Sequence, residues 1–265
     1  MSPNPEHDVV RCERVGAHVA LVTIDRPAAR NAIDPAVTQA LGALVVALEA
    51  DTTVRCVVLT GAGNQAFCAG ADLKAVAAGR MAALRTEVGG FAGFVFAPRR
   101  KLWIAAINGV ALAGGLELCL ACDLIVAAEH ARFGLPEVTR GLVALAGGVF
   151  RLPRALPRSI ALEMIATGEP IDAARAHALG LVNQLTPKDG ACDAALALAA
   201  RIAANAPLAV AESLAIAREA ATGATDEPTL RERGEAARAR IVASEDYVEG
   251  PRAFIEKRAP RWTGR

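Results

Sequence analysis

Two glutamates stand in sequence surroundings where a carboxylate can do chemistry. Glu117 follows a pair of glycines in an otherwise apolar segment, and Glu137 comes directly after the short stretch 133–136. Burial favours the neutral form of a carboxyl group, whereas a helix N-terminus favours its charged form. Two such carboxyl groups on one pocket could divide general-acid and general-base work. The alternative for Glu137 is an ordinary acidic residue at the start of a helix.

Two strand-turn-helix junctions, at 67–74 and 108–117, are built from small residues. Small side chains let a ligand approach the backbone, and the first N–H groups of a helix have no partner inside it. Two such groups converging from different loops would form an oxyanion hole. The alternative is that the glycines only permit tight turns.

These residues need a scaffold, and the sequence predicts strands that alternate with helices up to Pro187, followed by helices alone. Alternation of this kind predicts a right-handed α/β architecture. Asp34 and Pro35 are typical of a helix start. Residues 80–100 are predicted to be a helix or a mobile segment. The predicted strands are 8–14, 17–25, 55–60, 103–107, 124–127, 131–134 and 181–185, and the predicted helices are 35–50, one from about Ala71, 114–121, 147–155, 157–167, 171–179, 189–205, 207–222, 226–244 and 246–258.

Composition excludes several classes of protein. The 265 residues carry a formal net charge of +1, which argues against a nucleic-acid coat and an electrostatic membrane anchor. The polar start and the short apolar run 110–122 predict neither a signal peptide nor a membrane span, and so a cytoplasmic protein. The pair Cys119 and Cys122 is interpreted as core packing rather than a zinc or redox site, and the four scattered histidines predict no metal.

The chain resembles the enoyl-CoA hydratase/isomerase (crotonase) superfamily over about residues 8–260. The resemblance implies an α/β, crotonase-like right-handed spiral of ββα units at 1–187 and a C-terminal helical trimerisation region at 188–265. It also implies a homotrimer or a dimer of trimers that binds acyl-CoA thioesters and needs no cofactor. The matching blocks are 24–27 with 31–32, 69–73, 107–109, 113–117, 122–123, 133–137, 146–148, 180–183, 245–247 and 254–258.

The resemblance also implies roles for individual residues. The N–H groups of Ala71 and Gly114 would hold the thioester oxygen. Glu117 would assist the attack of water at the β-carbon, and Glu137 would supply the proton to the α-carbon. The coenzyme A contacts that it implies come from Ala32, Ala69, Ala71, Asp72, Leu73, Lys74, Gly114, Phe254 and Lys257, the last two commonly reaching a neighbouring subunit.

Having both glutamates favours hydration of a trans-2-enoyl-CoA. Departures from the family pattern keep other reactions open: Ala28 stands at a usual lysine, and Val149 and Phe150 replace Thr-Gln near the acyl pocket. Ala113 replaces a glycine, which an alanine tolerates if its φ is negative. The alternatives are a carnitinyl-CoA dehydratase-like hydro-lyase, an enoyl-CoA isomerase and, remotely, an acyl-CoA-binding protein without turnover.

Overall fold

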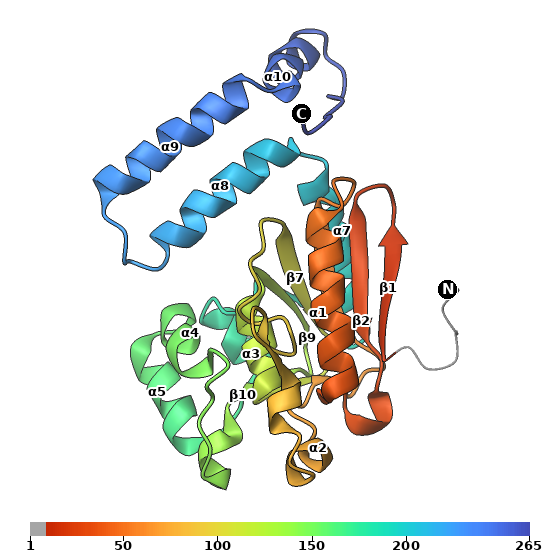
Figure 1. Ribbon diagram of the computed structural model, residues 1–265, viewed down its shortest axis with the longest axis vertical. Coiled ribbons are helices and arrows are strands. Elements are labelled where there is room, and N and C mark those ends of the chain that lie inside the picture. Colours follow the sequence, from red (N-terminus) through yellow and green to blue (C-terminus); the bar gives the residue numbers. More distant parts are fainter. Residues whose placement is uncertain (1–8) are drawn as a thin grey trace.

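The computed structural model describes residues 9–265, so the first residue of the predicted strand 8–14 lies outside the described part. Its larger sheet has six strands in the order β1-β2-β3-β7-β9-β12. Strands β2 to β12 pair in parallel, and β1 pairs antiparallel with β2 (Figure 1). The strands are β1 Val10–Val15, β2 Val19–Ile24, β3 Cys56–Gly61, β7 Leu102–Ile107, β9 Leu124–Ala128 and β12 Gln184–Thr186.

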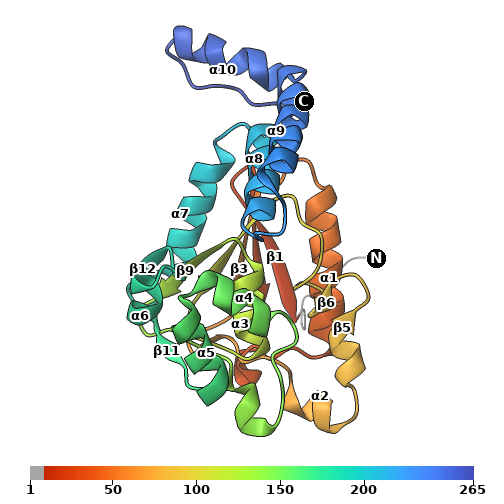
Figure 2. The same ribbon diagram turned by 90° about the vertical axis from the view of Figure 1, so that its left-hand side faces the viewer.

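Helices cover both faces of this sheet, which explains why its central strands are continuous apolar runs. Helix α1, Pro35–Ala50, covers one face, and its N-cap Asp34 accepts a hydrogen bond from the amide of Val37 (2.9 Å). Helix α7, Ala191–Ala203, covers the other face (Figure 2). Along β3, Val57 and Leu59 face the α1 side, and their neighbours face α7.

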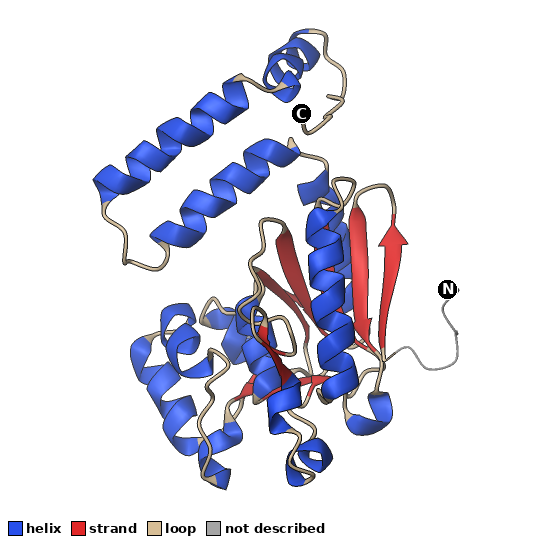
Figure 3. Ribbon diagram, in the orientation of Figure 1, coloured by secondary structure: helices blue, strands red, loops and turns tan. Residues whose placement is uncertain are grey.

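A second sheet of very short strands lies below the first and was not predicted as a sheet. Its order is β11-β10-β8-β4 (Figure 3). Three of its strands escaped prediction because two or three residues are too few to show an alternating pattern. The strands are β4 Ala66–Cys68, β8 Val110–Leu112, β10 Arg132–Gly134 and β11 Ile171–Asp172.

Three predicted elements are wrong in detail. The helix predicted at 171–179 begins only at Ala173, because the two residues before it form β11. Residues 80–100 are not one helix, since they hold the 3₁₀ turn Met81–Leu84, the two-residue strands β5 Arg85–Thr86 and β6 Gly90–Phe91, and turns. The strand predicted at 181–185 starts only at Gln184. Before it, the amide of Leu181 still bonds to the carbonyl of Ala176 (2.9 Å), so the apolar residues there are a buried helix end.

The remaining helices position the site and form the C-terminal part. Helices α8 and α9 lie side by side, and α10 ends the fold far from α2 (Figures 1 and 2). Within the described residues no single helix is long and apolar enough to cross a membrane, although α7 and α8 pass that test together as a pair bent by 107°. These helices are α2 Leu73–Ala77, α3 Gly114–Ala121, α4 Gly148–Ala155, α5 Arg158–Thr167, α6 Ala173–Ala178, α8 Pro207–Ala220, α9 Glu227–Val242 and α10 Glu245–Ile255.

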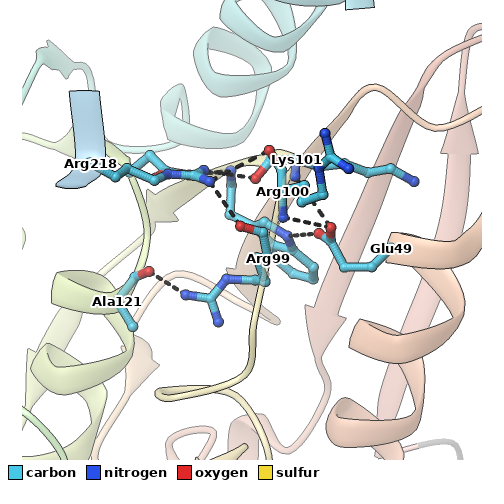
Figure 4. Close-up of polar contacts among 8 residues, drawn as sticks. Glu49, Arg99, Arg100, Lys101, Ala121 and Arg218 are labelled. Carbon is cyan, nitrogen blue, oxygen red and sulfur yellow. Dashed lines mark hydrogen bonds and ion pairs between the residues drawn. The ribbon is translucent and has the colours of Figure 1, made fainter. Parts of the chain in front are cut away.

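A polar cluster fastens α8 to the body of the protein (Figure 4). The Arg218 guanidinium bonds both oxygens of Asp123 at 2.7 Å and the carbonyls of Arg99 and Lys101 at 2.9 Å. Glu49 of α1 accepts from the amide of Arg100 (2.8 Å) on the other side of the same loop. The loop before β7 is thus held between α1 and α8, whereas α7 packs directly on the sheet.

Candidate active site

The two junctions predicted to supply amide donors meet in space. The Ile33 amide donates to the Gly70 carbonyl, and the Asp72 amide donates to the Ile33 carbonyl, both at 2.8 Å. Because alternate residues bond to Ile33, the N–H of Ala71 between them points away from Ile33. A Cβ placed on Gly70 would stand 3.0 Å from the amide nitrogen of Gly114. The structure therefore brings the Ala71 and Gly114 segments into contact.

Gly114 begins α3 in a tightly packed place. A Cβ on this residue would lie 2.5 Å from the ring of Phe91, so only glycine fits there without movement. The preceding Ala113 has φ +52° and ψ −128°. The condition for tolerating alanine, a negative φ, is therefore not met, and this residue is strained by about 1–3 kcal/mol. Its amide is fixed by the Gly134 carbonyl at 2.9 Å.

Glu117 lies in the first turn of α3 with only 4% of its surface exposed. Its Oε1 accepts a hydrogen bond from the amide of Gly148, the first residue of α4, at 2.9 Å. Burial raises the pKa of Glu117 to about 7, and the charge of Glu137 adds to this rise. The amides of Gly148 and Ala146 and the charge of Arg151 oppose it. The group can thus gain or lose a proton near neutral pH.

Glu137 lies in the 3₁₀ turn Pro136–Arg140, directly after β10. It is half-buried, and its Oε2 is a buried atom without a hydrogen-bond partner among the described residues. Burial raises the pKa of this carboxyl too, against the effects of its own amide and of Arg140. A Cβ on Gly148 would stand 2.9 Å from the Leu135 side chain and 3.1 Å from Oε1 of Glu117. The segment that leads into the Glu137 turn therefore meets the Glu117 carboxylate at the start of α4, where the charge of Glu137 acts on Glu117.

The residues predicted to contact coenzyme A divide into two groups. Ala32, Ala69 and the segment 72–74 lie around the start of α2, where Leu73 and Lys74 are exposed and Asp72 accepts from the Lys74 amide at 2.9 Å. Phe254, 85% exposed, and Lys257 lie at the end of α10, and within one chain they do not approach α2 (Figures 1 and 2). The structure therefore brings the residues of the first group together and places Phe254 and Lys257 far from them.

Three residues that build this site were not predicted as functional. Arg26 donates to Asp72 (2.9 Å) and to the Ala32 carbonyl (2.6 Å), so it joins two segments of the first group. Gly148 holds Glu117, and Phe91 packs on Gly114. Arg26 and Gly148 stand inside matching sequence blocks, which was the available signal, whereas nothing in the sequence marks Phe91. Within residues 9–265 no cluster of His, Cys, Asp or Glu could hold a metal ion.

Comparison with known proteins gives a consistent result. The family model described as enoyl-CoA hydratase/isomerase matches residues 14–265. Carnitinyl-CoA dehydratase of Proteus mirabilis is 42% identical over 252 residues, which are 92% of this chain and 94% of that protein. A solved enoyl-CoA hydratase from Mycobacterium marinum is 46% identical, with a TM-score of 0.92 over 98% of this chain and 100% of that chain. A carnitinyl-CoA hydratase structure from Mycobacterium avium is 47% identical, with a TM-score of 0.75 over the same shares. These similarities confirm the predicted crotonase-like α/β fold.

Proposed function

Because this chain belongs to the enoyl-CoA hydratase/isomerase family, we propose that it adds water reversibly to the double bond of a trans-2-enoyl-CoA thioester, giving a 3-hydroxyacyl-CoA. The observation that carries the proposal is the pair Glu117 and Glu137, two carboxyl groups with raised pKa values at one site. Beside them lie two main-chain segments with amides suited to an oxyanion. An isomerase that moves one proton would need only one of the two carboxyl groups.

The amides of Ala71 and Gly114 receive the thioester oxygen in this mechanism. Water addition at the β-carbon pushes electrons onto that oxygen, so the enolate-like state is more negative there than the substrate. Donors that are already in place stabilise this charge without reorganisation, and one donor contributes roughly 3 kcal/mol in comparable sites. The tight packing of Gly114 under Phe91 keeps its amide in place.

The two carboxyl groups divide the proton transfers. Ionised Glu117 accepts a proton from water as the oxygen attacks the β-carbon. Protonated Glu137 supplies the proton to the α-carbon, and in dehydration the two roles are reversed. Burial raises both pKa values, so each group is held closer to neutral pH than an exposed glutamate. Because the charges interact, their titrations belong to the pair.

Coenzyme A would lie along the first group of predicted contacts. We propose that backbone groups at Ala32 and Ala69 meet its adenine end, that 72–74 line the pantetheine, and that the exposed Lys74 ammonium meets a phosphate. Phe254 and Lys257 would reach the coenzyme A of another subunit in a trimer or a dimer of trimers. Apart from the coenzyme A of the substrate, no cofactor enters this mechanism. Action in the cytoplasm remains a proposal that cell fractionation would test.

A second candidate is favoured by the relatives named carnitinyl-CoA dehydratase at 42% identity. The same carboxyl pair and amides would then remove water from a 3-hydroxyacyl-CoA that carries a quaternary ammonium group. Val149 and Phe150, which depart from the usual hydratase residues near the acyl pocket, are consistent with a changed acyl group.

A substrate panel separates these functions. Purified protein is given crotonyl-CoA, crotonobetainyl-CoA and a 3-enoyl-CoA, and the products are identified by mass spectrometry and chromatography. Hydration of crotonyl-CoA with the largest kcat/KM supports the first proposal, and preference for crotonobetainyl-CoA supports the second. A shifted double bond without a gain of water indicates an isomerase. Acyl-CoA binding with no product from any of the three would refute every catalytic proposal.

A further inference from the structure

A half-buried arginine lies beside the site and has no role in the proposed chemistry. Arg151 belongs to α4, and its Nη2 donates to the Val95 carbonyl at 2.6 Å. Its Nη1 is buried and has no hydrogen-bond partner among the described residues. The guanidinium carbon lies 5.3 Å from the ring centre of Phe96 and 5.7 Å from that of Phe150. A cation removed from water in this way is costly unless something compensates it.

The turn that starts α4 connects this arginine to Glu117. The amide of Arg151 donates to the Gly147 carbonyl at 2.8 Å, and the amide of Gly148 donates to Glu117. A Cβ on Gly147 would stand 2.8 Å from Nη1 of Arg151, and one on Gly148 would stand 3.1 Å from Oε1 of Glu117. Neighbouring glycines thus pack on the guanidinium and on the carboxylate.

The charges around Glu117 come from few elements. Glu137 reaches it from the 3₁₀ turn after β10, and Arg151 is the cation that acts on it among residues 9–265. Arg99, from the loop before β7, and Arg154, one turn further along α4, act on Arg151 and not noticeably on Glu117. Arg99 is already bonded to the Ala121 carbonyl (2.6 Å) and lies over the Phe94 ring.

We propose that Arg151 is a positioning residue: it holds the turn at Gly147 and Gly148 against the backbone at Val95, which keeps the Gly148 amide on Glu117, and its positive charge favours the ionised form of that carboxylate. This inference rests on the proposed function of Glu117. The contact with Val95 fixes where α4 starts, and the charge compensates the burial of the carboxylate. Without the guanidinium, the pKa of Glu117 rises further and the base is less often ionised.

The charge is tested with Arg151→Met, Arg151→Gln and Arg151→Lys, and with Arg154→Met as a matched control from the same helix. Both neutral variants should lower kcat about tenfold or more while KM changes little, because the base and not the coenzyme A site is affected. The acidic limb of kcat/KM for crotonyl-CoA should move to higher pH, because the charge of Arg151 lowers the pKa of Glu117 in the wild type. Arg151→Lys should keep the limb near its wild-type pH, and Arg154→Met should match the wild type in all respects.

Titration of the Glu117 carboxyl separates this inference from the proposed function. Carbon-13 NMR of protein labelled at glutamate side-chain carboxyls, with Glu117→Gln to assign the signal, needs no turnover. The signal should titrate at higher pH in Arg151→Gln than in the wild type. A folded Arg151→Gln with an unchanged titration would overturn the inference, as would Arg151→Lys shifted as far as Arg151→Gln. If the wild type hydrates no substrate yet this shift occurs, the proposed function fails and the positioning role stands.

Discussion

The ionisation of Glu117 should make the stability of the protein depend on pH. Burial raises the pKa of this carboxyl from its ordinary 4.5 to about 7, so the folded state holds a proton that the unfolded chain releases. Such a rise corresponds to about 3 kcal/mol of destabilisation. Below pH 4.5 both states are protonated and the penalty is absent. It grows as pH rises from 4.5 to 7 and is complete above pH 7.

Glu117→Gln removes that penalty and leaves an amide oxygen that can still accept from Gly148. We expect the variant to match the wild type within about 1 kcal/mol at pH 4.5 and to be more stable by about 2–3 kcal/mol at pH 8. Urea unfolding followed by circular dichroism at several pH values measures the difference. Activity should fall at the same time, since the variant has lost its base.

The control for this experiment is Glu87→Gln, which changes an exposed glutamate outside the site. Its stability should follow that of the wild type at every pH. The reasoning is refuted if the stability gained by Glu117→Gln is the same at pH 4.5 and pH 8, because a constant gain would arise from packing and not from a buried charge.

Three further predictions concern the amides, the second carboxyl group and the C-terminal helices. Gly114→Ala should lower kcat/KM for crotonyl-CoA about 100-fold, because the new methyl group meets the buried ring of Phe91 and displaces the Gly114 amide. The control Gly234→Ala, in open space in the middle of α9, should leave activity unchanged and stabilise the protein slightly. Glu137→Gln should slow hydration about 100-fold or more while acyl-CoA still binds, as calorimetry would show; a fully active variant contradicts its role. Arg218→Met should destabilise the protein by about 2 kcal/mol, because it breaks a bidentate contact with the Asp123 carboxylate. Arg238→Met, which breaks an exposed ion pair, should cost under about 1 kcal/mol. Thermal denaturation measures both, and equal losses would contradict the role of Arg218 in attaching α8.

The large sheet and its helices were predictable because their signals are local and repeated. The central strands are continuous apolar runs, and α1 begins at Pro35, directly after its N-cap Asp34, where these two residues predicted a helix start. The second sheet was not predictable, since strands such as β4 and β11 have two or three residues and exist only through pairing with distant partners. The segment 80–100 failed for a related reason: Gly93 there packs on Gly42 of α1, a contact between distant residues.

The same distinction between local signals and contacts of distant residues applies to the candidate site. Glu117 and Glu137 could be selected from sequence because carboxylates in apolar surroundings are unusual and because their blocks resemble a family. Arg151 and Phe91 act through contacts between segments far apart in the chain, which no spacing reveals, and Gly148 is marked only by its matching sequence block. The sequence therefore indicates the proposed catalytic carboxyl groups more readily than the residues that hold them in place.

The residues of this chain with strained backbone, buried charge or unpaired buried polar atoms lie close together at the candidate site. Ala113 has a backbone conformation that favours glycine, Glu117 is a buried carboxyl, and Glu137 and Arg151 each keep a buried polar atom without a partner among the described residues. Each feature lowers stability, and natural sequences retain such features chiefly where function requires them. The strain at Ala113 immediately precedes the Gly114 amide, and the buried charges flank the turn that holds Glu117. Removing the buried charge of Glu117 should stabilise the fold and weaken catalysis together, as Glu117→Gln tests most directly.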